Sequence, residues 1–185
     1  MGIFSKIFGA KENKSEEKDY SFIADIAALI TDNDSEVVSK IRECASDPWG
    51  YAEKNAARYL QRDIVVSDRE EDDIDDICWI GMVDELSENG YLFAVDYSDD
   101  SDNILWGLPQ LKNYCLIEKY TEGFEADDDD DVETFVHKLN SALKGACICM
   151  IDIDSDSYEL IIVSFDVYEK ISMIAKNNGY SIITL

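Results

Sequence analysis

Histidine is nearly absent from this chain, and that absence disfavours several kinds of chemistry. His137 is the only histidine among 185 residues. Ser-His-Asp or Cys-His catalysis would have to use that one residue, and no nucleophile motif accompanies it. Zinc held by nitrogen and sulfur ligands is disfavoured for the same reason. Walker and GxGxxG phosphate-binding motifs are also missing. We therefore expect His137 to be a surface or boundary residue, and we expect a protein that is not an enzyme.

Long apolar runs and paired cysteine motifs are lacking too. No apolar run approaches the roughly 18 residues that a membrane-spanning helix needs. The five cysteines are odd in number and include no CxxC pair. With no signal peptide, this indicates reduced, mostly buried thiols and a cytoplasmic protein. Cys147 and Cys149 would lie on one face of a strand, where we expect core packing and not redox chemistry.

Basic residues are few, and the resulting charge restricts the choice of partner. The chain has 16 basic and 41 acidic residues, giving a net charge of −25. A field of that sign repels nucleic acids and anionic lipids. Its natural complements are a basic protein or cations, although acidity can also serve solubility alone. Apolar residues make up 46% of the chain, which is enough for a sizeable core.

The first 18 residues form an amphipathic and polar tail. Ile3, Phe4, Ile7 and Phe8 would share one face of a short helix. We expect this face to dock onto the protein's own surface. The alternative is weak membrane contact through residues 3–8, which bury too little to anchor the protein alone.

The next segment, residues 19–62, reads as a helical N-terminal layer of three helices. Its apolar residues recur at helical spacing, without a strand pattern. Asp34 or Ser35 can cap the second helix. Asp47 followed by Pro48 places a cap before proline at the first helical position, which is a clear start signal for the third.

Residues 63–185 read as an acidic α+β domain that forms one compact unit with the helical layer. A helix over about 74–88 carries apolar residues around most of its circumference, which predicts a central position. From strand 91–97 onward the order is β-α-β-β-α-β, typical of a ferredoxin-like split sheet. Residues 147–164 form its hairpin, because the short turn demands antiparallel neighbours.

The tryptophans divide into two groups by their surroundings. Trp79 and Trp106 lie on apolar stripes, so we expect both to be buried in the core. Trp49 follows the cap proline and fits either the core or an exposed position.

Three aspartates at alternate positions mark the turn of the predicted hairpin. Asp152, Asp154 and Asp156 resemble the start of a calcium loop, but Ser157 stands where an EF-hand needs glycine. Asp96 ends a strand that can neighbour this turn, so the four carboxylates are candidate ligands for Ca²⁺ or Mg²⁺. The alternative is a structural turn, in which the Asp and Ser side chains bond to the turn backbone.

Three acidic clusters are candidate contacts for a basic partner: residues 63–76, 96–102 and 125–131. A helix start explains two or three of these carboxylates through the helix dipole, but not all of them. The candidate partner-binding residues are Asp72, Asp73, Asp75, Asp76, Asp99, Asp100, Asp128, Asp129 and Asp130.

Two stretches, residues 72–111 and 143–182, carry a family resemblance. They contain Val95-Asp96, Trp106 and the turn DSDSY at 154–158. In these features the chain resembles a bacterial family of small acidic α+β proteins of unknown function, and the N-terminal 60 residues lie outside the resemblance. The family has no established catalytic residues, so the resemblance implies none here. Comparable small acidic proteins encoded beside secreted toxins serve as immunity proteins.

The sequence thus favours a non-enzymatic acidic binding protein, an immunity protein or inhibitor of a basic toxin such as a nuclease. Two alternatives remain open. One is an enzyme or sensor that uses a divalent cation at Asp96, Asp152, Asp154 and Asp156. The other is a peripheral membrane adaptor that acts through residues 3–8.

Overall fold

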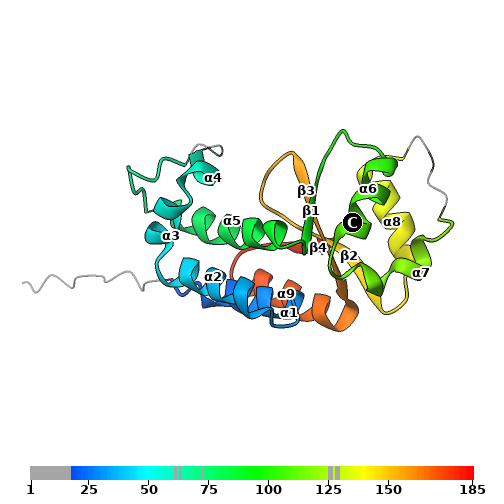
Figure 1. Ribbon diagram of the computed structural model, residues 1–185, viewed down its shortest axis with the longest axis horizontal. Helices are drawn as coiled ribbons and strands as arrows, with labels where there is room; N and C mark the ends of the chain where they lie inside the picture. The colour runs from blue at the N-terminus through cyan, green and yellow to red at the C-terminus, as the bar shows by residue number, and fades with distance from the viewer. Residues whose placement is uncertain (1–17, 61, 63, 72, 125–126, 128–129) are drawn as a thin grey trace, which may run out of the picture.

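A computed structural model describes residues 18–185 apart from seven positions, namely 61, 63, 72, 125–126 and 128–129 (Figure 1). The amphipathic face predicted for residues 3–8 lies outside the described residues. So do Asp72, Asp128 and Asp129 of the acidic clusters.

A four-stranded antiparallel sheet forms the centre of the molecule. Its strands are β1 (Leu92–Asp96), β2 (Ala146–Ile151), β3 (Ser157–Ser164) and β4 (Ile182–Thr184). They lie in the order β1-β3-β2-β4, with Val95 opposite Tyr158 and Cys149 opposite Ile161. The predicted hairpin is therefore the middle of the sheet, and β1 and β4 form its two edges.

The α+β class and the order of elements after residue 91 are confirmed, but the ferredoxin-like strand order is not. In a ferredoxin-like sheet the last strand lies beside the first, whereas here β4 pairs with β2 at the opposite edge. The helices account for the difference. Helix α5 leads directly into β1, while α9 packs over β2 and β3, so the chain leaving α9 reaches the edge of β2.

Helices cover both faces of the sheet (Figure 1). One face is covered by α1 (Ser21–Ile30), α2 (Ser35–Ser46), α5 (Asp73–Glu88) and α9 (Phe165–Asn177). The other is covered by α6 (Ser101–Gly107), η1 (Leu108–Gln110), η2 (Tyr114–Leu116), α7 (Glu118–Thr121) and α8 (Val132–Ala142). The short helices α3 (Pro48–Lys54) and α4 (Ala56–Leu60) extend the first layer along α2 and α5.

The start signals in the N-terminal layer act as predicted. The Asp34 side chain accepts a hydrogen bond from the backbone N–H of Glu36, and Asp47 accepts one from Gly50. The third expected helix is divided, because the chain leaves helical geometry at Asn55 between α3 and α4.

The core confirms most of the predicted burial. Trp79 is buried and stacks on Tyr180, with ring centroids 4.3 Å apart. Cys147 and Cys149 are buried on the same face of β2, as expected for core packing, and His137 is exposed. Among the helices of the described part of the chain, none combines the length and apolar character needed to cross a membrane.

Trp106 contradicts the prediction, because 69% of it is exposed. Helix α6 has only two turns, and the inward positions are filled by its Ile104 and by Leu108 at the start of η1. Gly107 packs so closely on the Phe93 ring that the sheet-facing side has no room for another large residue. Trp106 therefore points outward.

Candidate functional site

The β2–β3 turn is held by its own side chains. The Asp152 carboxylate accepts a hydrogen bond of 3.0 Å from the Asp154 N–H. The Ser155 hydroxyl accepts one of 3.3 Å from the Ser157 N–H. Asp154 has a φ of 54°, in the left-handed region that aspartate tolerates better than most residues. These are side-chain bonds to the turn backbone of the kind that the structural alternative predicted.

The carboxylates proposed as cation ligands do not form a ready-made cluster. Asp96 lies opposite Ser157 at the end of β1, and its carboxylate accepts bonds from the Ser98 hydroxyl and N–H. These bonds hold the pKa of Asp96 below its usual value. Asp156 meets β1 through its backbone, where its carbonyl accepts from Tyr97. Within the described residues no group of three or more His, Cys, Asp or Glu side chains could hold a metal ion, so the cation site stays a prediction.

Two of the predicted partner-binding residues are committed to ion pairs inside the chain. Asp75 binds the Lys18 ammonium at 2.8 Å and accepts a hydrogen bond from Tyr20. Asp130 binds Lys138 at 2.6 Å, and its side chain is only 8% exposed. Asp75 thus ties the segment before α1 to α5, and Asp130 ties the segment before α8 to that helix.

Other predicted residues remain at the surface. Asp76 is exposed and Asp73 half-buried in the first turn of α5. Partial burial raises the pKa of Asp76, and the negative charges of Asp73, Asp75 and Asp154 raise it further. The helix dipole would by itself lower this pKa. The local field at this end of α5 is therefore strongly negative.

The loop between β1 and α6 combines carboxylates with exposed aromatic rings. Asp100 caps α6, and Asp99 accepts bonds from the Asp96 N–H and the Asn103 amide. Tyr97 is 63% exposed. We call this region the acidic–aromatic surface; it consists of Asp96, Tyr97, Asp99, Asp100, Asp102 and Trp106. Asp102 and Trp106 are one helical turn apart, so they share the outward face of α6.

A second feature near the turn is a cavity of about 560 Å³. It lies between α5, the β2–β3 turn and the connection from α9 to β4, and Asp76, Asp152 and Asp154 line it together with Trp79 and Tyr180. The structure thus brings part of the predicted cation site together with part of the predicted acidic surface. It leaves Asp96 and Asp156 outside this cavity.

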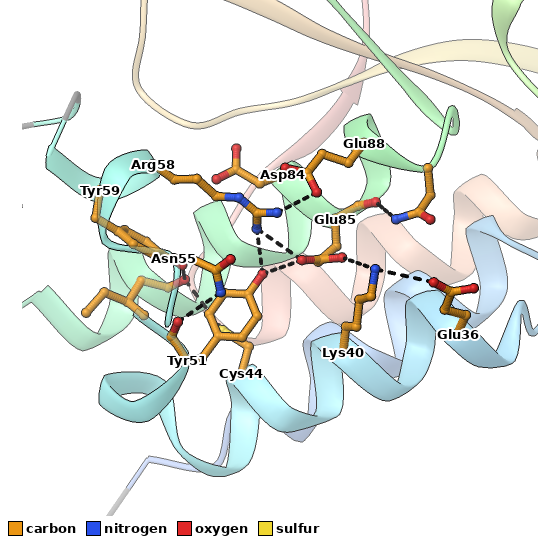
Figure 2. Close-up of polar contacts among 12 residues, drawn as sticks. Glu36, Lys40, Cys44, Tyr51, Asn55, Arg58, Tyr59, Asp84, Glu85 and Glu88 are labelled. Carbon is orange, nitrogen blue, oxygen red and sulfur yellow. Dashed lines mark hydrogen bonds and ion pairs between the residues drawn. The ribbon is translucent and has the colours of Figure 1, made fainter. Parts of the chain in front are cut away.

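Sequence reasoning missed the buried carboxylate of Glu85. Glu85 is 3% exposed and lies on α5, where side chains from three other helices converge on it (Figure 2). The Tyr51 hydroxyl donates to its Oε1 at 2.6 Å, and the Arg58 guanidinium does so at 3.0 Å. The Lys40 ammonium lies 3.6 Å from Oε2. Burial raises the pKa of Glu85, but these partners outweigh it and hold the pKa below its usual value.

This network fastens the N-terminal layer to α5. Arg58 also pairs with Glu88 at 2.5 Å and donates to the Tyr51 hydroxyl. The signal that could have revealed Glu85 is the apolar circumference of its helix. A carboxylate on a helix that is buried nearly all round needs a buried partner.

These features define a class of protein: an acidic antiparallel α+β protein, enclosed by helices, with exposed aromatic rings among its surface carboxylates. Residues 22–185 match the model of a family described as a domain of unknown function (DUF6630), and the chain belongs to this family. The predicted membership of an uncharacterised family is confirmed, and the match also includes the N-terminal helices that the resemblance left out. No curated protein and no solved structure matches the chain.

Proposed function

We propose that this protein is a non-enzymatic binding protein for a basic protein partner, which it contacts through the acidic–aromatic surface. The observation that carries the proposal is the exposure of Trp106 and Tyr97 among carboxylates. Aromatic side chains are enriched in protein interfaces and provide much of their binding energy.

The charge of the chain supports a basic partner. In the part of the chain that the structure describes, Asp96, Asp99, Asp100 and Asp102 form no ion pair, so nothing in that part neutralises them. Unpaired surface charge of one sign attracts the opposite sign and raises association rates by about 10 to 10³. The specific role that we propose is inhibition of, or immunity to, a basic toxin such as a nuclease.

A pull-down from the native host tests the proposal. The wild-type protein is immobilised, and retained proteins are identified at low and high salt. We expect a basic partner whose retention falls steeply with salt. Retention should be lost in Trp106→Ala and kept in Phe165→Ala. Phe165 is a suitable control because it is also exposed but begins α9, on the opposite face of the sheet.

Two outcomes would contradict the proposal. One is that no basic protein is retained even at low salt. The other is that a basic protein is retained equally well by Trp106→Ala and by the wild type.

A further inference from the structure

The cavity beside α5 has the size and lining of a binding pocket. Its volume of about 560 Å³ lies within the ordinary range for ligand sites, about 300–1,000 Å³. Trp79, Ile80 and Tyr180 contribute apolar surface, and the Trp79 indole N–H donates to the Asp152 carbonyl at 2.8 Å. That bond fixes the ring against the β2–β3 turn, so the lining is held in place.

The charged side chains that line the cavity are mostly negative. Asp76, Asp152 and Asp154 line it and form no ion pair with any cation in the described part of the chain. Arg62 also lines it, but its guanidinium pairs with Asp84 at 3.1 Å. Partial burial raises the pKa of Asp76, and the negative charges of Asp73, Asp75 and Asp154 raise it further.

The protein's own Lys18 shows how this region binds a cation. The Lys18 ammonium lies 5.1 Å from the centre of the Tyr180 ring and 2.8 Å from the carboxylate of Asp75. An aromatic face and a carboxylate from the first turn of α5 thus hold an ammonium group together. Tyr180 also lines the cavity, to which the first turn of α5 contributes Asp76.

We propose that this cavity is a pocket for the guanidinium or ammonium group of a basic side chain of the partner. The inference rests on the proposed function and extends it, because it names the group that the partner inserts. The β2–β3 turn lines the cavity at Asp152 and Asp154, and it contacts the acidic–aromatic surface where the Tyr97 N–H donates to the Asp156 carbonyl at 3.1 Å. A partner that covers this turn would contact both.

The test uses a small probe and the full chain, so it needs no partner. N-acetyl-arginine methylamide is titrated against the protein while its NMR spectrum is recorded. The matched control is the citrulline analogue, which has nearly the same shape and no charge. We expect the arginine probe to shift the Trp79 indole N–H and the Gly179 amide with millimolar affinity, and the citrulline analogue to shift neither.

Variants then assign the binding to the cavity. Asp76→Asn and Asp154→Asn should each weaken the arginine probe by up to about fivefold, the size of one exposed charge interaction. Asparagine tolerates the left-handed backbone at position 154, so this variant should fold, and its thermal unfolding checks that. Asp100→Asn, on the acidic–aromatic surface, should leave probe binding unchanged.

The outcomes separate this inference from the proposed function. It is overturned if the two probes cause equal shifts, if the shifts appear only on the acidic–aromatic surface, or if Asp76→Asn and Asp154→Asn bind the probe like the wild type. Partner retention that persists in both variants would also overturn it while leaving the proposed function intact. A bound probe without any basic partner would instead contradict the proposed function and, with it, the assignment of the bound group to a partner.

Discussion

Replacing Glu85 tests whether one buried carboxylate fastens the N-terminal layer to α5. Alanine would leave the Tyr51 hydroxyl and the Arg58 guanidinium without their acceptor. Removing one partner of a buried ion pair costs about 3–5 kcal/mol. Arg58 is 21% exposed and keeps Glu88, so water and that second carboxylate recover part of the loss. We expect Glu85→Ala to lower the free energy of unfolding by about 3 kcal/mol.

Glu85→Gln isolates the charge, because its amide oxygen still accepts from Tyr51. We expect a loss of about 1–2 kcal/mol, the difference between a charged and a neutral hydrogen bond. Urea unfolding at pH 7 measures it as a lower midpoint at unchanged slope. Glu36→Gln is the matched control, since Glu36 also pairs with Lys40 but is 75% exposed, and it should cost no more than about 0.5 kcal/mol. Equal stabilities of the two variants would refute the reasoning.

The difference in stability between the wild type and Glu85→Gln should also depend on pH. The pKa of Glu85 is lowered in the folded protein, from an ordinary value near ~4.3. Its ionised form therefore stabilises the fold fully above pH ~4.3, and that contribution is lost as the pH falls through the lower folded pKa. The stability gap between wild type and Glu85→Gln should be widest at neutral pH and should close in acid. A gap that stays constant in acid would show that ionisation is not its source.

Three further predictions follow from individual side chains. Asp76→Asn should raise the melting temperature at neutral pH, because the raised pKa of this carboxyl means that its ionised form destabilises the fold. The gain in melting temperature should vanish in acid. A melting temperature that is unchanged at neutral pH would contradict this prediction. Trp106→Ala should change the free energy of unfolding by no more than about 0.5 kcal/mol, while Trp79→Ala should lower it by about 3–5 kcal/mol. Equal losses for the two variants in urea unfolding would contradict the exposure of Trp106 and the burial of Trp79. Gly107→Ala should cost about 1–3 kcal/mol, because its new Cβ would lie 2.1 Å from the Phe93 ring, and Phe93→Leu in the same chain should relieve part of that loss.

Much of the fold could be predicted from the sequence because burial repeats at the period of each element. The apolar circumference of residues 74–88 predicted a central helix, and α5 spans Asp73–Glu88. The short turn within residues 147–164 predicted the antiparallel pairing of β2 and β3. The caps at Asp34 and Asp47 act locally, so the sequence around each of them is sufficient.

Strand order could not be predicted in the same way. The period of a strand shows which of its residues are buried but not which strand lies beside it. Strand β4 has three residues, with Ile182 buried and Ile183 exposed, and that pattern suits an edge beside β1 equally well. Its place beside β2 depends on how α5 and α9 occupy the covered face, which is a tertiary effect.

The site was only partly predictable for a related reason. Sequence identifies a carboxylate but not its partner, so Asp75, Asp99 and Asp130 looked equivalent. In the structure Asp75 and Asp130 bind lysines, whereas Asp99 bonds to an amide and a backbone N–H. The predicted burial of Trp106 was wrong for the opposite reason. Its apolar neighbours suggested burial, but Gly107 occupies the position nearest the sheet.

The ion pairs also help to distinguish whether the negative charge of the chain serves solubility or binding. Some carboxylates bind cations from segments that are distant in sequence, as Asp34, Asp75 and Glu85 do. Unpaired carboxylates occur along the β1–α6 loop and the β2–β3 turn, next to Tyr97 and exposed Trp106. These carboxylates beside exposed aromatic rings support the proposal of a basic partner at this edge of the sheet, and its binding should weaken with salt.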